Sequence, residues 1–192
     1  MKLSDLLREK SSAILRRWQD LTLATYPQPS RRVFRSQKDR FANPVGHALQ
    51  SGTRSAWERL VEGQSAGEIV ACLDEIIKIR AVQDLPPSAA IAFVFALKDA
   101  IRMELESEDL ALASSPELVD VEARIDQIAL GVFDVFMRYR AKICELRISE
   151  VKRSVGRHAE RLSRRSSPLE SEEKPLVEGI SDCAQAQRGD GR

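Results

Sequence analysis

A regular spacing of apolar residues in the C-terminal half constrains the fold of this chain most. Between Leu118 and Tyr139, apolar side chains recur at alternating intervals of three and four, the period of one α-helical face. A second apolar series runs on to Leu162. A helix from Pro116 to Arg165 would be about 75 Å long at ~1.5 Å per residue, longer than a domain core. We therefore expect its C-terminal part to form a coiled-coil-like arm.

The N-terminal part predicts further helices. An apolar stripe over 3–21 predicts a first helix, which Pro27 and Pro29 would end. The basic segment 30–42 lacks such a stripe, and we expect a loop with one helical turn there.

Two start signals are well defined in the middle of the chain. Asn43 followed by Pro44 is an N-cap with proline at the first helical position. Ser65 and Glu68 have capping-box spacing and predict a single helix over 65–82. With few glycines and prolines elsewhere, the sequence predicts an all-α protein.

The longest apolar run, Ala89 to Leu97, belongs to a helix that is apolar nearly all round and is expected at the centre of the fold. This run is far shorter than the roughly 20 residues that cross a bilayer. Residues 1–10 are polar and charged, unlike a signal peptide. We expect a cytoplasmic protein with no membrane insertion.

The charge is distributed unevenly, although the net charge is only +1. Residues 147–165 include seven basic and two acidic side chains, whereas residues 166–192 include three basic and six acidic ones. The last segment has too few apolar residues to form a core. We predict a helical domain over 1–146, a basic linker or coiled-coil-like helix over 147–165, and a disordered tail over 166–192.

Three stretches carry a resemblance to a known family: Lys38–His47, Ile76–Asp84 and Ile125–Arg153. They resemble the N-terminal domain of the RsbR-type proteins, the RsbT co-antagonists of the bacterial stressosome. The resemblance implies a globin-like helical bundle without haem, with a long C-terminal helix, that dimerises and receives a signal in the stress response. In that family a phosphorylated STAS domain follows. Residues 166–192 show no alternating β pattern, so we expect no such output domain in this chain.

No catalytic, cofactor-binding or metal-binding constellation is evident, and we expect a protein that is not an enzyme. His47 and His158 have no second ligand at metal spacing. A haem needs only one axial histidine, which leaves a haem or small-molecule sensor as an alternative. Its pocket would lie near His47 and four of the six phenylalanines. These are Phe93, Phe95, Phe133 and Phe136.

The three cysteines form neither a disulfide framework nor a metal site, because they are an odd number and widely spaced. They are Cys72, Cys144 and Cys183. Cys144 falls on the second apolar series, where we expect a buried structural thiol.

Arg80 and Asp84 are four residues apart and could pair on one helical face. The pair is interpreted either as a structural salt bridge or, together with His47, as part of a switch or partner surface. The arginines of 147–165 could form a solvated coiled-coil face, contact an acidic protein partner or the acidic residues of 166–192, or bind nucleic acid. No aromatic side chain is interleaved for base stacking, which makes nucleic acid the less favoured partner.

The sequence therefore predicts a non-enzymatic regulatory module that senses a signal or binds a partner protein, which the sequence does not identify. We expect a homodimer whose seam follows the last helix. The candidate seam residues are Val132, Val135, Ile148, Val151 and Val155.

Overall fold

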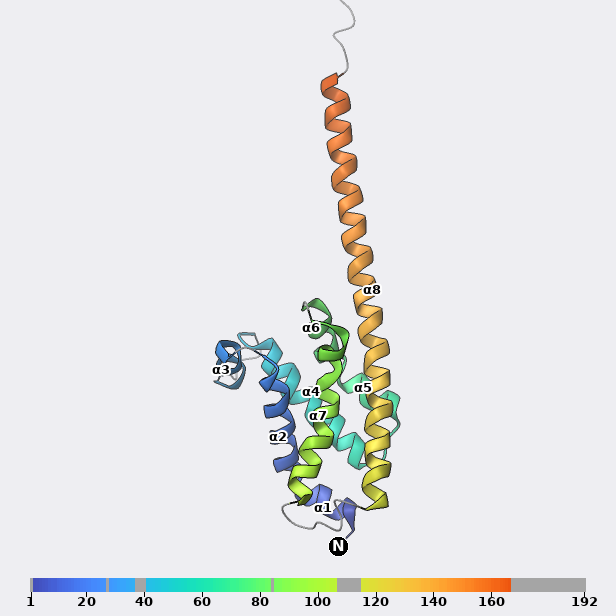
Figure 1. Ribbon diagram of the computed structural model, residues 1–192. Helices are drawn as coiled ribbons and strands as arrows, with labels where there is room; N and C mark the ends of the chain where they lie inside the picture. Colours follow the sequence, from blue (N-terminus) through green and yellow to red (C-terminus); the bar gives the residue numbers. More distant parts are fainter. Residues whose placement is uncertain (1, 27, 37–40, 84, 107–114, 167–192) are drawn as a thin grey trace, which may run out of the picture. The chain divides into compact units, whose positions relative to one another are not determined.

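The computed structural model describes residues 2–26, 28–36, 41–83, 85–106 and 115–166. These residues form eight α-helices and no strand (Figure 1). The all-α class predicted from the sequence is confirmed. The finer prediction of a globin-like arrangement stays a prediction.

The N-terminal apolar stripe folds into two helices rather than the predicted one: α1 (Leu3–Glu9) and α2 (Ser11–Ala24). The helices are interrupted at Lys10, while the Ser11 hydroxyl donates to the carbonyl oxygen of Leu7 at 3.0 Å. The predicted loop after them is also wrong in part, because α3 occupies Gln28–Ser36.

The predicted caps are confirmed. Asn43 caps α4 (Pro44–Val61), and its Oδ1 accepts from the backbone N–H of Gly46 at 2.8 Å. Ser65 and Glu68 form the capping box of α5 (Ala66–Cys72).

The helix predicted over 65–82 is divided at Leu73, after which α6 (Asp74–Val82) begins. Leu73 is buried in the core. At this junction α4 comes very close, since a Cβ on Gly52 would lie 3.0 Å from the carbonyl oxygen of Cys72. Tertiary packing therefore determines the break.

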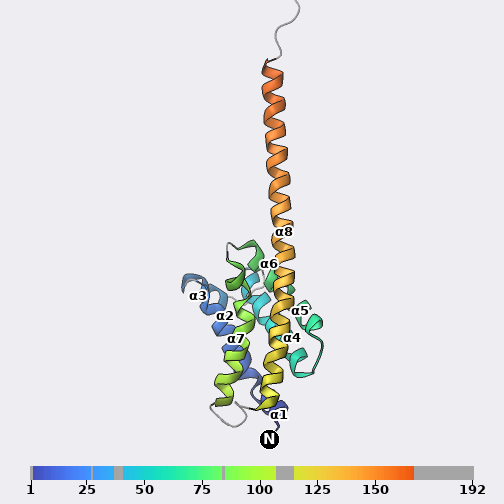
Figure 2. The same cartoon turned by 45° about the vertical axis from the view of Figure 1, so that its right-hand side comes forward.

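Helix α7 (Pro87–Glu106) packs along α2, as Figures 1 and 2 show. The indole Nε1 of Trp18 donates to the carbonyl oxygen of Phe93 at 2.6 Å, and both side chains are fully buried. The expectation of a central helix holds for one side of α7 only, because Phe95 is 41% exposed.

Helix α8 (Pro116–Ser166) is continuous. Contacts divide the chain into two units, Met1–Leu146 and Arg147–Arg192. In the first unit α8 contributes a row of core residues. These are Leu118, Ile125, Ile128, Ala129, Val132 and Phe136. In the second unit nearly every side chain up to Leu162 is exposed.

Ser166 ends α8, and the rest of the predicted disordered tail lies outside the described residues. Among the helices described, none is long and apolar enough to cross a membrane.

Candidate functional site

Arg80, in the last turn of α6, is a buried cation with a side chain only 1% exposed. Its Nη1 donates to the carbonyl oxygens of Ala89 and Ala90 at 3.2 and 3.4 Å. Its Nη2 donates to the hydroxyl of Thr25 at 3.3 Å. One guanidinium group thus connects the end of α2, the end of α6 and the start of α7.

Two aromatic rings hold the same guanidinium group. Its central carbon lies 5.3 Å from the ring centre of Tyr26 and 5.0 Å from that of Phe93. Both distances suit cation–π attraction. Burial lowers the pKa of Arg80, but an arginine stays charged at any physiological pH. Arg80 is therefore a structural junction between three helices.

The predicted Arg80–Asp84 pair stays a prediction, because Asp84 lies outside the described residues. Within the described part, the Nε of Arg80 is buried and has no hydrogen-bond partner.

A second polar network joins α6 to α8. The hydroxyl of Tyr139 donates to Asp74 Oδ1 at 2.7 Å, and Lys78 Nζ lies 2.6 Å from Asp74 Oδ2. One residue further along α8, Arg140 donates to the carbonyl oxygen of Ala81 at 3.2 Å. These contacts hold α8 against the helix that contains Arg80.

The electrostatics of this network follow from its geometry. Burial raises the pKa of Asp74, but the hydrogen bonds from Lys78 and Tyr139 outweigh burial and lower that pKa overall. The pKa of Tyr139 is raised, mainly because its hydroxyl is bonded to the carboxylate.

We expect Asp74→Asn to lower the free energy of unfolding by about 1 kcal/mol at pH 7, since solvent screens this partly exposed site. A lowered folded-state pKa gives stability that is present above the ordinary value of 3.8 and is lost as the pH falls through the folded value. The difference from the parent should therefore shrink between pH 7 and pH 3. Urea unfolding at both pH values measures it, with Glu75→Gln as the control. An equal loss at both pH values would contradict the assignment.

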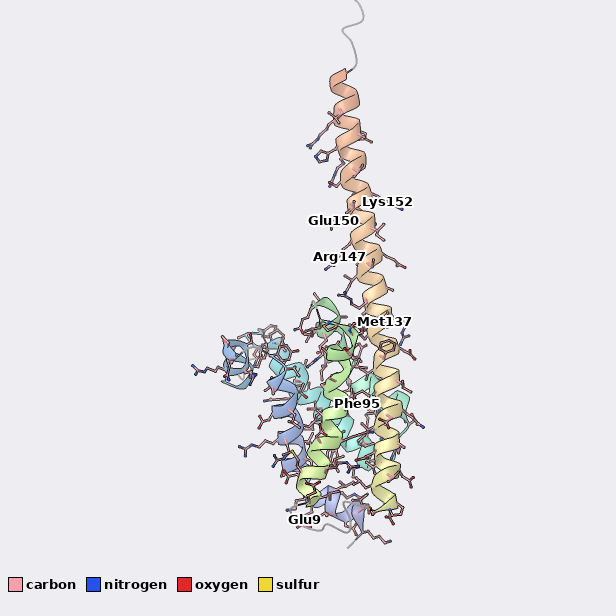
Figure 3. The ribbon with its side chains drawn as sticks, in the orientation of Figure 1. Glu9, Phe95, Met137, Arg147, Glu150 and Lys152 are labelled. Carbon is pink, nitrogen blue, oxygen red and sulfur yellow. The ribbon has the colours of Figure 1, made fainter. Side chains whose placement is uncertain are left out.

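An exposed apolar stripe follows α8 in each of the two units. In the first unit it comprises Leu130, Phe133, Met137 and Cys144, and in the second Ile148, Val151 and Val155. Figure 3 labels Met137 of this stripe and Phe95 of α7. The prediction that Cys144 is buried is wrong in the single chain, because its side chain is exposed.

The candidate seam residues differ in their exposure to solvent. Val132 is buried in the core, so its assignment to a seam with another chain is wrong. Val135 is half-buried, whereas Ile148, Val151 and Val155 are exposed. At about 3.6 residues per turn, Val132 and Val135 lie roughly opposite Ile148 on the helical wheel of α8, so one stripe cannot include all five candidates.

The alternative pocket near His47 is not supported by the positions of its residues. His47 is exposed on α4. Phe93 and Phe136 are buried, whereas Phe95 and Phe133 are exposed, so the four rings do not enclose one cavity. In the described part of the chain, no group of three or more histidine, cysteine or acidic side chains could hold a metal ion.

Comparison with protein families gives a match over most of the chain. The family model of the RsbT co-antagonist protein rsbRD N-terminal domain matches residues 12–151. The chain belongs to this family. The rsbRD N-terminal domain thus includes seven of the eight helices, α2 to α8, although α8 extends beyond it. Neither the curated proteins nor the solved structures give a match.

Proposed function

We propose that this chain is a non-enzymatic signal-input module of the stressosome type, which acts in the cytoplasm as a homodimer and passes its signal to a partner protein. Membership of the rsbRD N-terminal domain family supports a signalling role. The exposed stripe of α8 is the observation that supports the proposed dimer.

The spacing of this stripe is that of a two-helix interface. Ile148, Val151 and Val155 are separated by intervals of three and four, as in a heptad repeat. All three are at least half exposed, and arginine, lysine and glutamate occupy the other faces of the same segment. Within the described part of its unit, 147–166, nothing covers this stripe, and it fits the same stripe of a second copy.

Coupling between the units is proposed to run through α8. The Asp74–Tyr139 and Arg140–Ala81 contacts tie this helix to α6, and Arg80 ties α6 to α2 and α7. A signal that shifts α6 can thereby change the rotation or register of two paired α8 helices.

Val151→Asp tests the stripe. We expect the dimer dissociation constant to rise at least ~100-fold, because two carboxylates would face each other at the seam. Sedimentation equilibrium of the full chain measures it. Arg153→Asp, an exposed position on the opposite face of the helix, is the control and should change the constant less than about fivefold. Equal effects of the two substitutions would place the interface elsewhere.

A further inference from the structure

A cleft of about 570 Å³ lies between α5 and α8 within the unit Met1–Leu146. Small and apolar groups form one part of its lining: Gly67, Val70, Ala71 and Val135. The cleft falls in the size range of small-molecule sites, which combine an apolar surface with a few polar groups.

The cationic part of the lining comes from α8. Arg138 and Lys142 are one helical turn apart, and both are exposed. Neither forms an ion pair or a hydrogen bond with any residue that the structure describes. Two cations on adjacent turns are spaced to hold one anionic group between them.

The only acidic group in the lining is already satisfied. Asp74 uses one carboxylate oxygen for Lys78 and the other for Tyr139. Its single negative charge is already opposed by Lys78, and the charge of Arg138 also contributes to lowering its pKa. The cleft therefore has an excess of positive charge.

The apolar part is held in place by close helix packing. A Cβ on Gly131 would lie 2.9 Å from Cγ2 of Val70, so α5 and α8 approach each other as closely as a glycine allows. Val70 itself is buried beside this contact. The apolar surface is thus formed before any ligand arrives, which reduces the entropy cost of binding.

We propose that this cleft binds a small organic anion, with its carboxylate or phosphate group between Arg138 and Lys142 and its apolar body on Val70, Ala71 and Val135. The bound molecule lies against Tyr139 and Asp74, the contact that ties α6 to α8. Binding itself is independent of the proposed function, whereas its use as the sensed signal rests on it.

Titration of the ¹⁵N-labelled full chain with four probes tests the proposal. They are phenyl phosphate, benzoate, inorganic phosphate and benzyl alcohol. Phenyl phosphate or benzoate should shift the amide signals of Gly67, Val70 and Ala71 saturably. Its dissociation constant should be at least ~10-fold lower than that of inorganic phosphate or benzyl alcohol. The preferred ring compound distinguishes phosphate from carboxylate as the anionic group. Failure of both ring compounds to shift these signals at millimolar concentration would overturn the proposal.

Variants separate the two halves of the site. The double variant Arg138→Gln with Lys142→Gln should raise the dissociation constant of the preferred ring compound at least ~10-fold. The control Lys152→Gln should leave that constant unchanged. Ala71→Leu should weaken the ring anion and leave inorganic phosphate unchanged, because it fills only the apolar part. An unchanged dissociation constant in the Arg138→Gln and Lys142→Gln double variant would also contradict the proposed site.

The outcomes for ligand and dimer are distinguishable. A chain that binds the ring anion but sediments as a monomer would retain the cleft and contradict the proposed dimeric function. A dimer that binds none of the four probes would contradict the cleft alone.

Discussion

Trp18→Ala should lower the free energy of unfolding by about 3–5 kcal/mol. Trp18 is 1% exposed, and its ring fills the space between α2 and α7 while its Nε1 donates to Phe93. Truncation to alanine leaves a cavity and removes that hydrogen bond. Urea unfolding followed by circular dichroism measures the loss, and Trp57, the other tryptophan of the chain, supplies a fluorescence readout.

Two control variants separate the contributions to this loss of stability. Trp18→Phe keeps most of the ring and removes the donor, so we expect a smaller loss of about 1–2 kcal/mol. Val119→Ala, at an exposed position of α8, should stay within about 0.5 kcal/mol of the parent. A loss below about 1 kcal/mol for Trp18→Ala would contradict the packing of α2 on α7.

Gly46→Ala should be the second most damaging of the proposed substitutions, with a loss of roughly 2–4 kcal/mol from lost capping and overpacking together. The added methyl group would lie 2.6 Å from the carbonyl oxygen of Phe34 and 2.7 Å from Cγ of Asn43. Asn43 accepts from the Gly46 N–H and donates from Nδ2 to that same Phe34 carbonyl at 2.9 Å. The substitution therefore displaces the cap of α4 and the end of α3 together.

Thermal unfolding of Gly46→Ala, Asn43→Ala and the double variant measures this coupling. Because both single changes remove the same cap, the double variant should be less destabilised than the sum of the two. Gly67→Ala is the matched control, since a Cβ there would meet no atom within 4 Å. It should be neutral or stabilising by up to about 1 kcal/mol. Additive losses would show that the cap is not displaced by the methyl group.

Features encoded by neighbouring residues could be predicted from the sequence. The caps at Asn43 and Ser65 depend on side chains that bond to backbone groups three residues away, so the local spacing specifies them. The breaks at Lys10 and Leu73 could not be predicted, since neither is marked by glycine or proline. The apolar pattern continues through both, and packing of distant segments determines where the helices end.

In the candidate site, too, local spacing could be predicted from the sequence, whereas contacts between distant segments could not. Arg80 was singled out by its spacing from Asp84, but its burial between Tyr26 and Phe93 depends on residues far away in the sequence. The cleft at Arg138 and Lys142 was missed because its lining comes from helices α5, α6 and α8. A weak signal existed, namely two cations at an interval of four without an acidic residue between them.

The subunit mass of the purified full chain tests the central claim most directly. The chain has a mass of 21.5 kDa, and sedimentation equilibrium at micromolar concentration should give twice that value. A dimer that becomes monomeric with Val151→Asp and persists with Arg153→Asp is the result we predict. A parent chain that remains at 21.5 kDa across this concentration range would contradict a homodimeric input module formed through α8.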